Sequence, residues 1–167
     1  MNIGDSMDRI EAIIEIPVGT RNKYEVDKVN DKVKLNRVLA SAMTYPAEYG
    51  YIDNTLANDN DPLDILVISS EATFPGCIVP ARVIGCLEMY DNGKEDFKII
   101  SVVDVDPRYN EINNLEDLSS FTLQEIKNFF ENYKTLEKIS VVVKEYHNKE
   151  FALRVIEESK QKYLEAK

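Results

Sequence analysis

Glycine is scarce in this chain of 167 residues, and its spacing excludes two nucleotide-binding motifs. The six glycines are never closer than eight positions to one another. A dinucleotide-binding turn requires glycines two and three positions apart, and a P-loop requires two glycines five positions apart before a lysine. The sequence contains neither motif.

Histidine and cysteine are scarcer still. His147 is the only histidine and no G-x-S-x-G motif occurs, so a Ser-His-Asp hydrolase of the usual kind has little support. Cys77 and Cys86 are too few for a four-cysteine zinc site or a disulfide framework. We expect both thiols to be buried in strands, as suits a reducing cytoplasm, and His147 to be a solvated loop residue.

Long apolar runs and excess positive charge are also missing. No run approaches the roughly 18 apolar residues that a membrane-spanning helix needs, and the N-terminus lacks the basic and apolar regions of a secretory signal. Lys and Arg number 20 against 30 Asp and Glu, a net charge of −10. Proteins bind nucleic-acid backbones by neutralising phosphates with Lys and Arg. We therefore expect a cytoplasmic protein with neither a membrane nor a nucleic-acid partner.

The first two thirds of the chain have the pattern of short strands. Period-two alternation and short apolar runs predict strands near residues 11–17, 23–28, 32–39, 64–69, 77–89 and 97–105. The Asn92-Gly93 pair predicts a hairpin between two aspartates, Asp91 and Asp96.

The last third changes to the helical period. Apolar residues three and four positions apart predict a helix from Thr122 to about Leu136, with Thr122 and Glu125 as a capping box. A strand at 139–146 and a second helix at 149–165 follow. The whole chain, 1–167, is expected to form a single α+β domain, rich in β structure, in which the strands make a small coiled barrel and the helices pack outside it.

Three carboxylates stand within six residues at 59–64, directly before an apolar strand. Such clustering is costly unless cations offset the repulsion. Pro62 stiffens the turn so that Asp59 and Asp64 can converge, and oxygen ligands at this spacing suit Mg²⁺ or Mn²⁺ rather than zinc. An acidic surface turn whose aspartates cap their own backbone is the alternative interpretation.

Further charged residues strengthen the case for a site. Lys98 lies two residues beyond Asp96, on the same face of a strand. Candidates of both signs, with three tyrosines beside a turn, lie upstream: Glu15, Lys23, Glu25, Arg37, Tyr45, Tyr49 and Tyr51. This mixture suits a metal held by the acids and a phosphate-like anion held by Lys, Arg and Tyr.

Together these segments resemble the family I soluble inorganic pyrophosphatases. The resemblance rests on motifs that follow one another along the chain: Glu15-Ile16-Pro17, Lys23-Tyr24-Glu25, Arg37, residues 45–51, 59–64 and 91–98, Asp106-Pro107-Arg108-Tyr109 and residues 129–134. It implies an OB-like five-stranded barrel with peripheral helices. It also implies hydrolysis of pyrophosphate to two phosphates with Mg²⁺, or with Mn²⁺ or another divalent cation, by a homo-oligomer that is usually a hexamer.

The resemblance assigns roles to individual residues. The implied metal ligands are Asp59, Asp64, Asp91, Asp96 and Glu15. The implied phosphate-binding groups are Lys23, Arg37, Tyr49, Lys98, Tyr133 and Lys134, with Glu25 supporting them. Asp61 is the implied general base beside the nucleophilic water.

The chain departs from the family pattern at a few positions. Asn60 stands where glycine is frequent, and we expect it to adopt the left-handed conformation that asparagine tolerates. Glu48 places an additional acid beside Tyr49. Asn128 and Asn132 stand where some bacterial relatives have histidines, which bears on how subunits pack.

Two other functions remain open from the residues themselves. A calcium-binding module without catalysis could use the acidic turn, although Leu63 and Asp64 occupy positions that an EF-hand gives to other residues. An OB-like oligonucleotide binder requires a basic, aromatic surface, which the net charge and the lack of tryptophan disfavour. The pyrophosphatase interpretation requires the acidic segments at 59–64 and 91–96 to meet in space.

Overall fold

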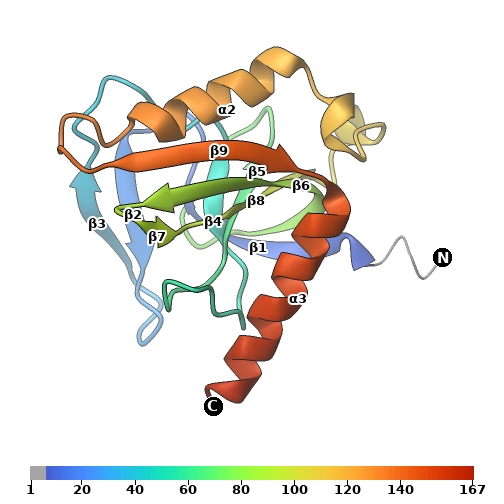
Figure 1. Ribbon diagram of the computed structural model, residues 1–167, viewed down its shortest axis with the longest axis horizontal. Coiled ribbons are helices and arrows are strands. Elements are labelled where there is room, and N and C mark those ends of the chain that lie inside the picture. Colours follow the sequence, from blue (N-terminus) through green and yellow to red (C-terminus); the bar gives the residue numbers. More distant parts are fainter. Residues whose placement is uncertain (1–6) are drawn as a thin grey trace.

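The computed structural model of the protein describes residues 7–167, and a seven-stranded sheet is its largest element (Figure 1). Its strands are β1 (Arg9–Ile16), β4 (Glu48–Tyr51), β5 (Asp64–Ile68), β6 (Ile78–Asp91), β7 (Lys94–Glu95), β8 (Lys98–Val103) and β9 (Val141–His147). The long strand β6 pairs with β8 on one side and with β1 on the other. The order β1-β4-β5-β8-β6 therefore closes into a ring of five strands, and β7 and β9 extend from β6.

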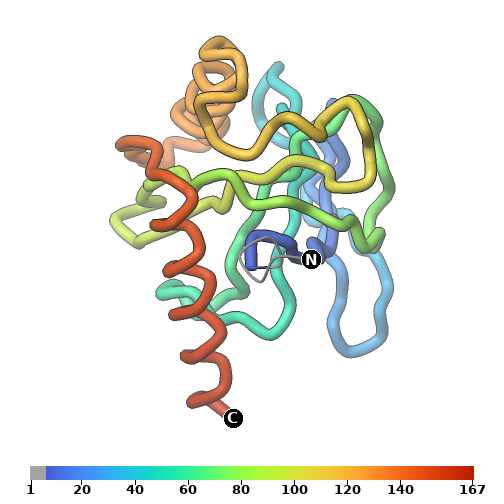
Figure 2. The backbone as a smooth tube through the Cα atoms, turned by 90° about the vertical axis from the view of Figure 1, so that its right-hand side faces the viewer, coloured from blue at the N-terminus to red at the C-terminus, as the bar shows by residue number. Residues whose placement is uncertain are grey.

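Two helices cover this ring from different sides. Helix α2 (Ser120–Asn132) lies along β9, and α3 (Lys149–Glu165) runs away from the end of β9 (Figures 1 and 2). Two short 3₁₀ helices, Pro107–Tyr109 and Leu115–Asp117, connect β8 to α2. No helix within residues 7–167 is long and apolar enough to cross a membrane.

The apolar core consists of two clusters, which lie on opposite faces of the strands. Along β5, Leu66 packs in a cluster with the α2 residues Phe129 and Phe130. Its neighbours Ile65 and Val67 face the other way, into a cluster that includes residues of α3. Successive side chains of a strand point to opposite faces, so a strand buried on both faces reads as a continuous apolar run. The predicted α+β class, with a closed five-stranded sheet and outer helices, is confirmed.

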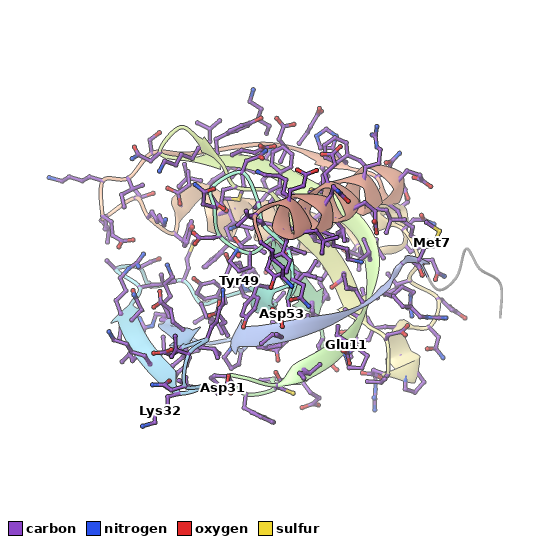
Figure 3. The ribbon with its side chains drawn as sticks, turned by 90° about the horizontal axis from the view of Figure 1, so that it is seen from below. Met7, Glu11, Asp31, Lys32, Tyr49 and Asp53 are labelled. Carbon is purple, nitrogen blue, oxygen red and sulfur yellow. The ribbon has the colours of Figure 1, made fainter. Side chains whose placement is uncertain are left out.

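A separate two-stranded ribbon stands beside the ring, at the left of Figure 1. It consists of β2 (Asn22–Val26) and β3 (Val33–Val38), and its register places Lys23 opposite Arg37. Asp31 and Lys32, in the connection between β2 and β3, lie at the edge of the molecule, whereas Tyr49 lies nearer the middle of the view (Figure 3). The ribbon thus carries two of the predicted phosphate-binding residues on one element.

Some local predictions were wrong. Helix α2 begins at Ser120, and the Ser119 hydroxyl accepts a hydrogen bond from the Phe121 N–H at 3.2 Å, so the proposed Thr122 cap lies inside the helix. Because the helix ends at Asn132, Leu136 is exposed rather than part of its apolar face. Cys86 is buried, but Cys77 is only half-buried; both are free thiols.

Strand β4 was not predicted, and Gly50 explains how it fits. A Cβ atom at position 50 would lie 1.9 Å from the carbonyl oxygen of Ile13 on β1. The backbones of β1 and β4 therefore approach more closely than any side chain at this position permits.

We expect Gly50→Ala to lower the free energy of unfolding by about 3 kcal/mol, because the clash is with backbone that cannot move without breaking the ring. Thermal denaturation measures the loss. Gly76→Ala is the matched control: Gly76 has a positive φ of 96° but no atom near its missing Cβ, so conformational strain alone costs about 1 kcal/mol. Equal losses in the two variants would contradict the steric explanation.

Candidate active site

A cleft of about 680 Å³ opens between the β2–β3 ribbon, the 59–64 turn, the β6–β7 hairpin and the end of α2. All the residues to which the family resemblance assigns a role, except Arg37, line it. They are Glu15, Lys23, Glu25, Tyr49, Asp59, Asp61, Asp64, Asp91, Asp96, Lys98, Tyr133 and Lys134. The two acidic segments therefore do meet in space.

The 59–64 turn is shaped by hydrogen bonds within it. The Asp61 N–H donates to the Asp59 carboxylate at 3.0 Å, and the Ala57 N–H donates to the Asp61 carbonyl at 2.8 Å. Asn60 has φ 67°, which confirms the left-handed conformation expected of it. The turn ends where β5 begins, so Asp64 is fixed by the sheet while Asp59 and Asp61 are held by the turn.

The hairpin has the predicted Asn-Gly turn. Asn92 and Gly93 both have positive φ, 52° and 81°, as a type I′ turn requires. Asp91 closes β6, and Asp96 follows β7 directly. The Asn58 side chain donates to Glu95, which joins the hairpin to the acidic turn.

The acidic turn is also tied to the C-terminal helix. The Leu56 N–H donates to the Ser159 carbonyl at 2.9 Å, and the Lys162 ammonium donates to the Asn58 side chain at 2.6 Å. Hydrogen bonds thus join the segment at the acidic turn to the hairpin and to α3, which are both distant from it in sequence.

Lys98 lies at the centre of the site and is almost fully buried. Its ammonium donates to Asp64 at 2.7 Å, to Asp96 at 2.9 Å and to the Tyr49 hydroxyl at 2.9 Å. Burial by itself would lower the pKa of Lys98, but Asp64 and its other partners raise that pKa well above its usual value. Lys98 is therefore charged and offsets part of the repulsion between the two acids.

Several acids of the cleft lack enough nearby positive charge or hydrogen bonds to offset the cost of burying their charged form. Burial raises the pKa of Asp64 to about 6, and the charge of Lys98 offsets this only in part. Burial also raises the pKa of Glu15 and of Asp59, in each case against a backbone hydrogen bond that lowers it. Carboxylates that gather in a cleft and hold their protons too tightly form a donor set that fits a divalent cation.

Positive groups lie in the same cleft. Burial lowers the pKa of Lys23, and the nearby charges of Arg37 and Lys134 lower it further. Lys134 pairs with Asp91 of the hairpin. Burial raises the pKa of Tyr49 and of Tyr133, so both keep their hydroxyl protons for donation to an anion. The cleft thus combines ligands for a cation with donors for an anion.

Asp61 is more exposed than the other two acids of its turn, Asp59 and Asp64. Its side chain is exposed, and it takes part in no ion pair with any residue from 7 to 167. A carboxylate that is free in this way can accept a proton from a water molecule in the cleft.

Arg37 and Glu48 both lie outside the lining of the cleft. Arg37 does not line the cleft; its guanidinium pairs with Glu137 at 2.9 Å. Glu48 is fully buried and accepts hydrogen bonds from the Val18 and Thr73 N–H groups, the second at 2.6 Å. Glu48 therefore joins two loops instead of adding charge to the site.

The sequence interpretation also missed residues that line the cleft. Lys94 and Glu95 stand between Asp91 and Asp96, so the predicted hairpin itself carried the signal for them. Lys28 lines the cleft from the connection after β2, with its ammonium 4.6 Å from the centre of the Tyr51 ring. No motif pointed to Lys28.

His147 was wrongly predicted to be a solvated loop residue. It ends β9, stacks on Phe151 with ring centres 4.0 Å apart, and its Nε2 lies 2.8 Å from Glu88. Possible metal-ligand atoms of His147, Glu88 and Glu145 lie within 4.8 Å of one another. This cluster is not part of the cleft lining, and the Glu88–His147 pair accounts for its geometry.

A family model described as inorganic pyrophosphatase matches residues 12–164. The chain belongs to this family. A curated inorganic pyrophosphatase from Halalkalibacterium halodurans is 53% identical over 154 residues, which are 92% of this chain and 94% of that protein. One from Geobacillus stearothermophilus is 51% identical over 95% of this chain and 96% of its own length.

Solved structures agree with the sequence relatives. The inorganic pyrophosphatase of Thermus thermophilus matches with a TM-score of 0.91 and 39% identity, over 98% of this chain and 97% of that one. The Helicobacter pylori enzyme gives a TM-score of 0.92 and 40% identity over 98% of both chains. The resemblance stated from the motifs is thereby confirmed, and the chain is an enzyme of the inorganic pyrophosphatase family.

Proposed function

We propose that this pyrophosphatase-family enzyme hydrolyses inorganic pyrophosphate to two orthophosphates with Mg²⁺, and that the cleft is its active site. The observation that carries this proposal is the meeting of two acidic segments with Lys23, Lys98 and Lys134 in one cleft. Family membership supports the same reaction.

The acids of the cleft would hold the divalent cations. Asp59, Asp64, Asp91, Asp96 and Glu15 offer carboxylate oxygens, the ligands that Mg²⁺ and Mn²⁺ prefer. When bound, such cations lower the pKa of a water molecule and neutralise phosphate oxygens. The raised pKa values of Glu15, Asp59 and Asp64 fit this role, because a cation that displaces their protons relieves the cost of burying them.

The other side chains of the site have distinct roles in the proposed reaction. Asp61 takes the proton of the attacking water. The phosphate oxygens are held by Lys23, Arg37, Tyr49, Lys98, Tyr133 and Lys134, which offset charge on the departing phosphate. Glu25 supports the ribbon by accepting a hydrogen bond from the Asn36 side chain at 3.1 Å. Attack in line with the leaving phosphate needs no covalent enzyme intermediate.

The cellular location and the oligomeric state are proposed from the resemblance to the family. We propose a cytoplasmic homo-oligomer, a hexamer, in which this chain supplies the single domain that the sequence predicts.

Phosphate release tests the proposed function. Purified protein should release phosphate from pyrophosphate in Mg²⁺, and EDTA should abolish the release because the acids alone repel the substrate. A colorimetric phosphate assay follows the reaction, and EDTA saturated beforehand with Mg²⁺ is the control. Undiminished hydrolysis in EDTA would contradict the metal requirement. Calcium binding by calorimetry without phosphate release in Mg²⁺ would favour the non-catalytic module instead.

A further inference from the structure

The ion pair between Arg37 and Glu137 joins two elements that flank the cleft. Arg37 is on β3, and Glu137 is on the turn between α2 and β9, with Nε and Oε1 2.9 Å apart. Both side chains are partly shielded, 32% and 19% exposed. The ribbon that carries Arg37 forms its own two-stranded sheet, apart from the seven-stranded one. The pair is therefore a direct link between this ribbon and the α2–β9 turn.

The geometry of the pair leaves part of the guanidinium free. Arg37 Nη1 donates to the Asn36 side chain at 3.2 Å, while Nη2 makes no hydrogen bond to any residue in 7–167. The Nε–H is buried and not aligned with the Glu137 oxygen, and the second Glu137 oxygen is buried without a partner. The Glu137 carboxylate thus attracts the Nε side of the Arg37 guanidinium by charge, and the pair does not form the two parallel hydrogen bonds of a bidentate arginine–carboxylate pair.

Both partners are placed next to cations of the cleft. Arg37 is the register partner of Lys23, which lines the cleft. The Glu137 N–H donates to the carbonyl of Lys134 at 3.1 Å, and Lys134 also lines the cleft. The charge of Arg37 contributes to the lowered pKa of Lys23, second to burial, so the two cations are close.

We propose that Glu137 is a positioning residue: it holds the guanidinium of Arg37 beside the cleft, with Nη2 free for a phosphate oxygen of the substrate. This inference rests on the proposed function. Without Glu137, Arg37 keeps its charge but samples many rotamers, and the anion must bear the cost of ordering it.

Whether removal of Glu137 weakens or strengthens anion binding distinguishes positioning of Arg37 from a simple charge effect. Glu137 is negative and lies near a site for a polyanion, so by simple repulsion its removal would strengthen binding of the anion. Positioning of Arg37 predicts the opposite, a weaker complex.

The test is a double-mutant cycle in which the affinity for a substrate analogue is measured. The probe is imidodiphosphate, a pyrophosphate analogue, titrated calorimetrically with Mg²⁺ present. Glu137→Ala should weaken its binding about tenfold and raise the KM for pyrophosphate similarly. In an Arg37→Ala background the same substitution should have almost no effect, because the group that it positions is gone.

Two further variants secure the interpretation. Glu131→Ala removes an exposed acid of α2 and should leave binding unchanged. Glu137→Gln keeps the shape and one acceptor oxygen; it should give an intermediate loss, and it decides the question if the alanine variant does not fold.

Different outcomes overturn different claims. The positioning role would be overturned if the Glu137 variants bound the analogue as tightly as the wild type or more tightly. It would also be overturned if Glu137→Ala weakened binding equally with Arg37 present and with Arg37→Ala. In both cases Arg37→Ala alone would still weaken binding, so the proposed phosphate contact of Arg37 would stand. A wild-type protein that neither binds the analogue nor hydrolyses pyrophosphate would overturn the proposed function itself, and this inference with it.

Discussion

Asp61→Asn is expected to lower the turnover number for pyrophosphate about 10²- to 10⁴-fold, the range that a positioned general base contributes. Asparagine keeps the size of the side chain but cannot accept the proton of the attacking water. The Asp61 N–H, which shapes the turn by donating to Asp59, is unaffected. Steady-state phosphate release gives kcat and KM separately, and the loss should fall on kcat.

Asp53→Asn is the matched control for this substitution. Asp53 is an exposed acid on the chain segment that precedes the acidic turn, and it does not line the cleft. Its variant should retain wild-type kcat. Full activity in Asp61→Asn would remove the assignment of the base without affecting family membership.

Lys98→Met is expected to lower the free energy of unfolding of the metal-free protein by about 3 kcal/mol. Removing one partner of a buried ion pair leaves an uncompensated buried charge, and here Asp64 and Asp96 both lose their cation. Denaturant unfolding in EDTA measures the loss. Added Mg²⁺ should restore more stability to the variant than to the wild type, because the freed acids then bind the cation.

Lys160→Met is the control for the loss of a lysine charge. Lys160 is on α3, and its one ion pair within residues 7–167 is an exposed pair with Glu157 at 3.6 Å. Its replacement should change stability by no more than about 0.5 kcal/mol. If the Lys98 variant were as stable as this control in EDTA, the central ion-pair network would not be a source of stability.

The parts of the site that depend on neighbours in sequence were predictable. The Asn92-Gly93 hairpin follows from backbone chemistry, and Lys98 and Asp96 share a face because they are two residues apart. The partnership of Lys98 with Asp64 was not accessible in this way. It depends on the parallel register of β5 and β8, in which these two residues are direct partners.

The errors have a common physical cause. Strand β4 was missed because its sequence, Glu-Tyr-Gly-Tyr, has too few apolar residues to reveal a period, and Gly50 is required by the close approach of β1 rather than by a turn. The partners of Arg37 and His147 are distant in sequence. Pairings of this kind are set by tertiary packing, which local propensity does not encode.

The link between the acidic turn and α3 gives the end of the chain a part in the site. Within this helix, the Ser159 carbonyl accepts a hydrogen bond from the Leu56 N–H and the Lys162 ammonium donates to the Asn58 side chain, shortly before Asp59 in the chain. Helix ends fray more easily than sheet interiors. Order in the last two turns of α3 therefore affects how firmly the segment that leads into the proposed metal-binding turn is held.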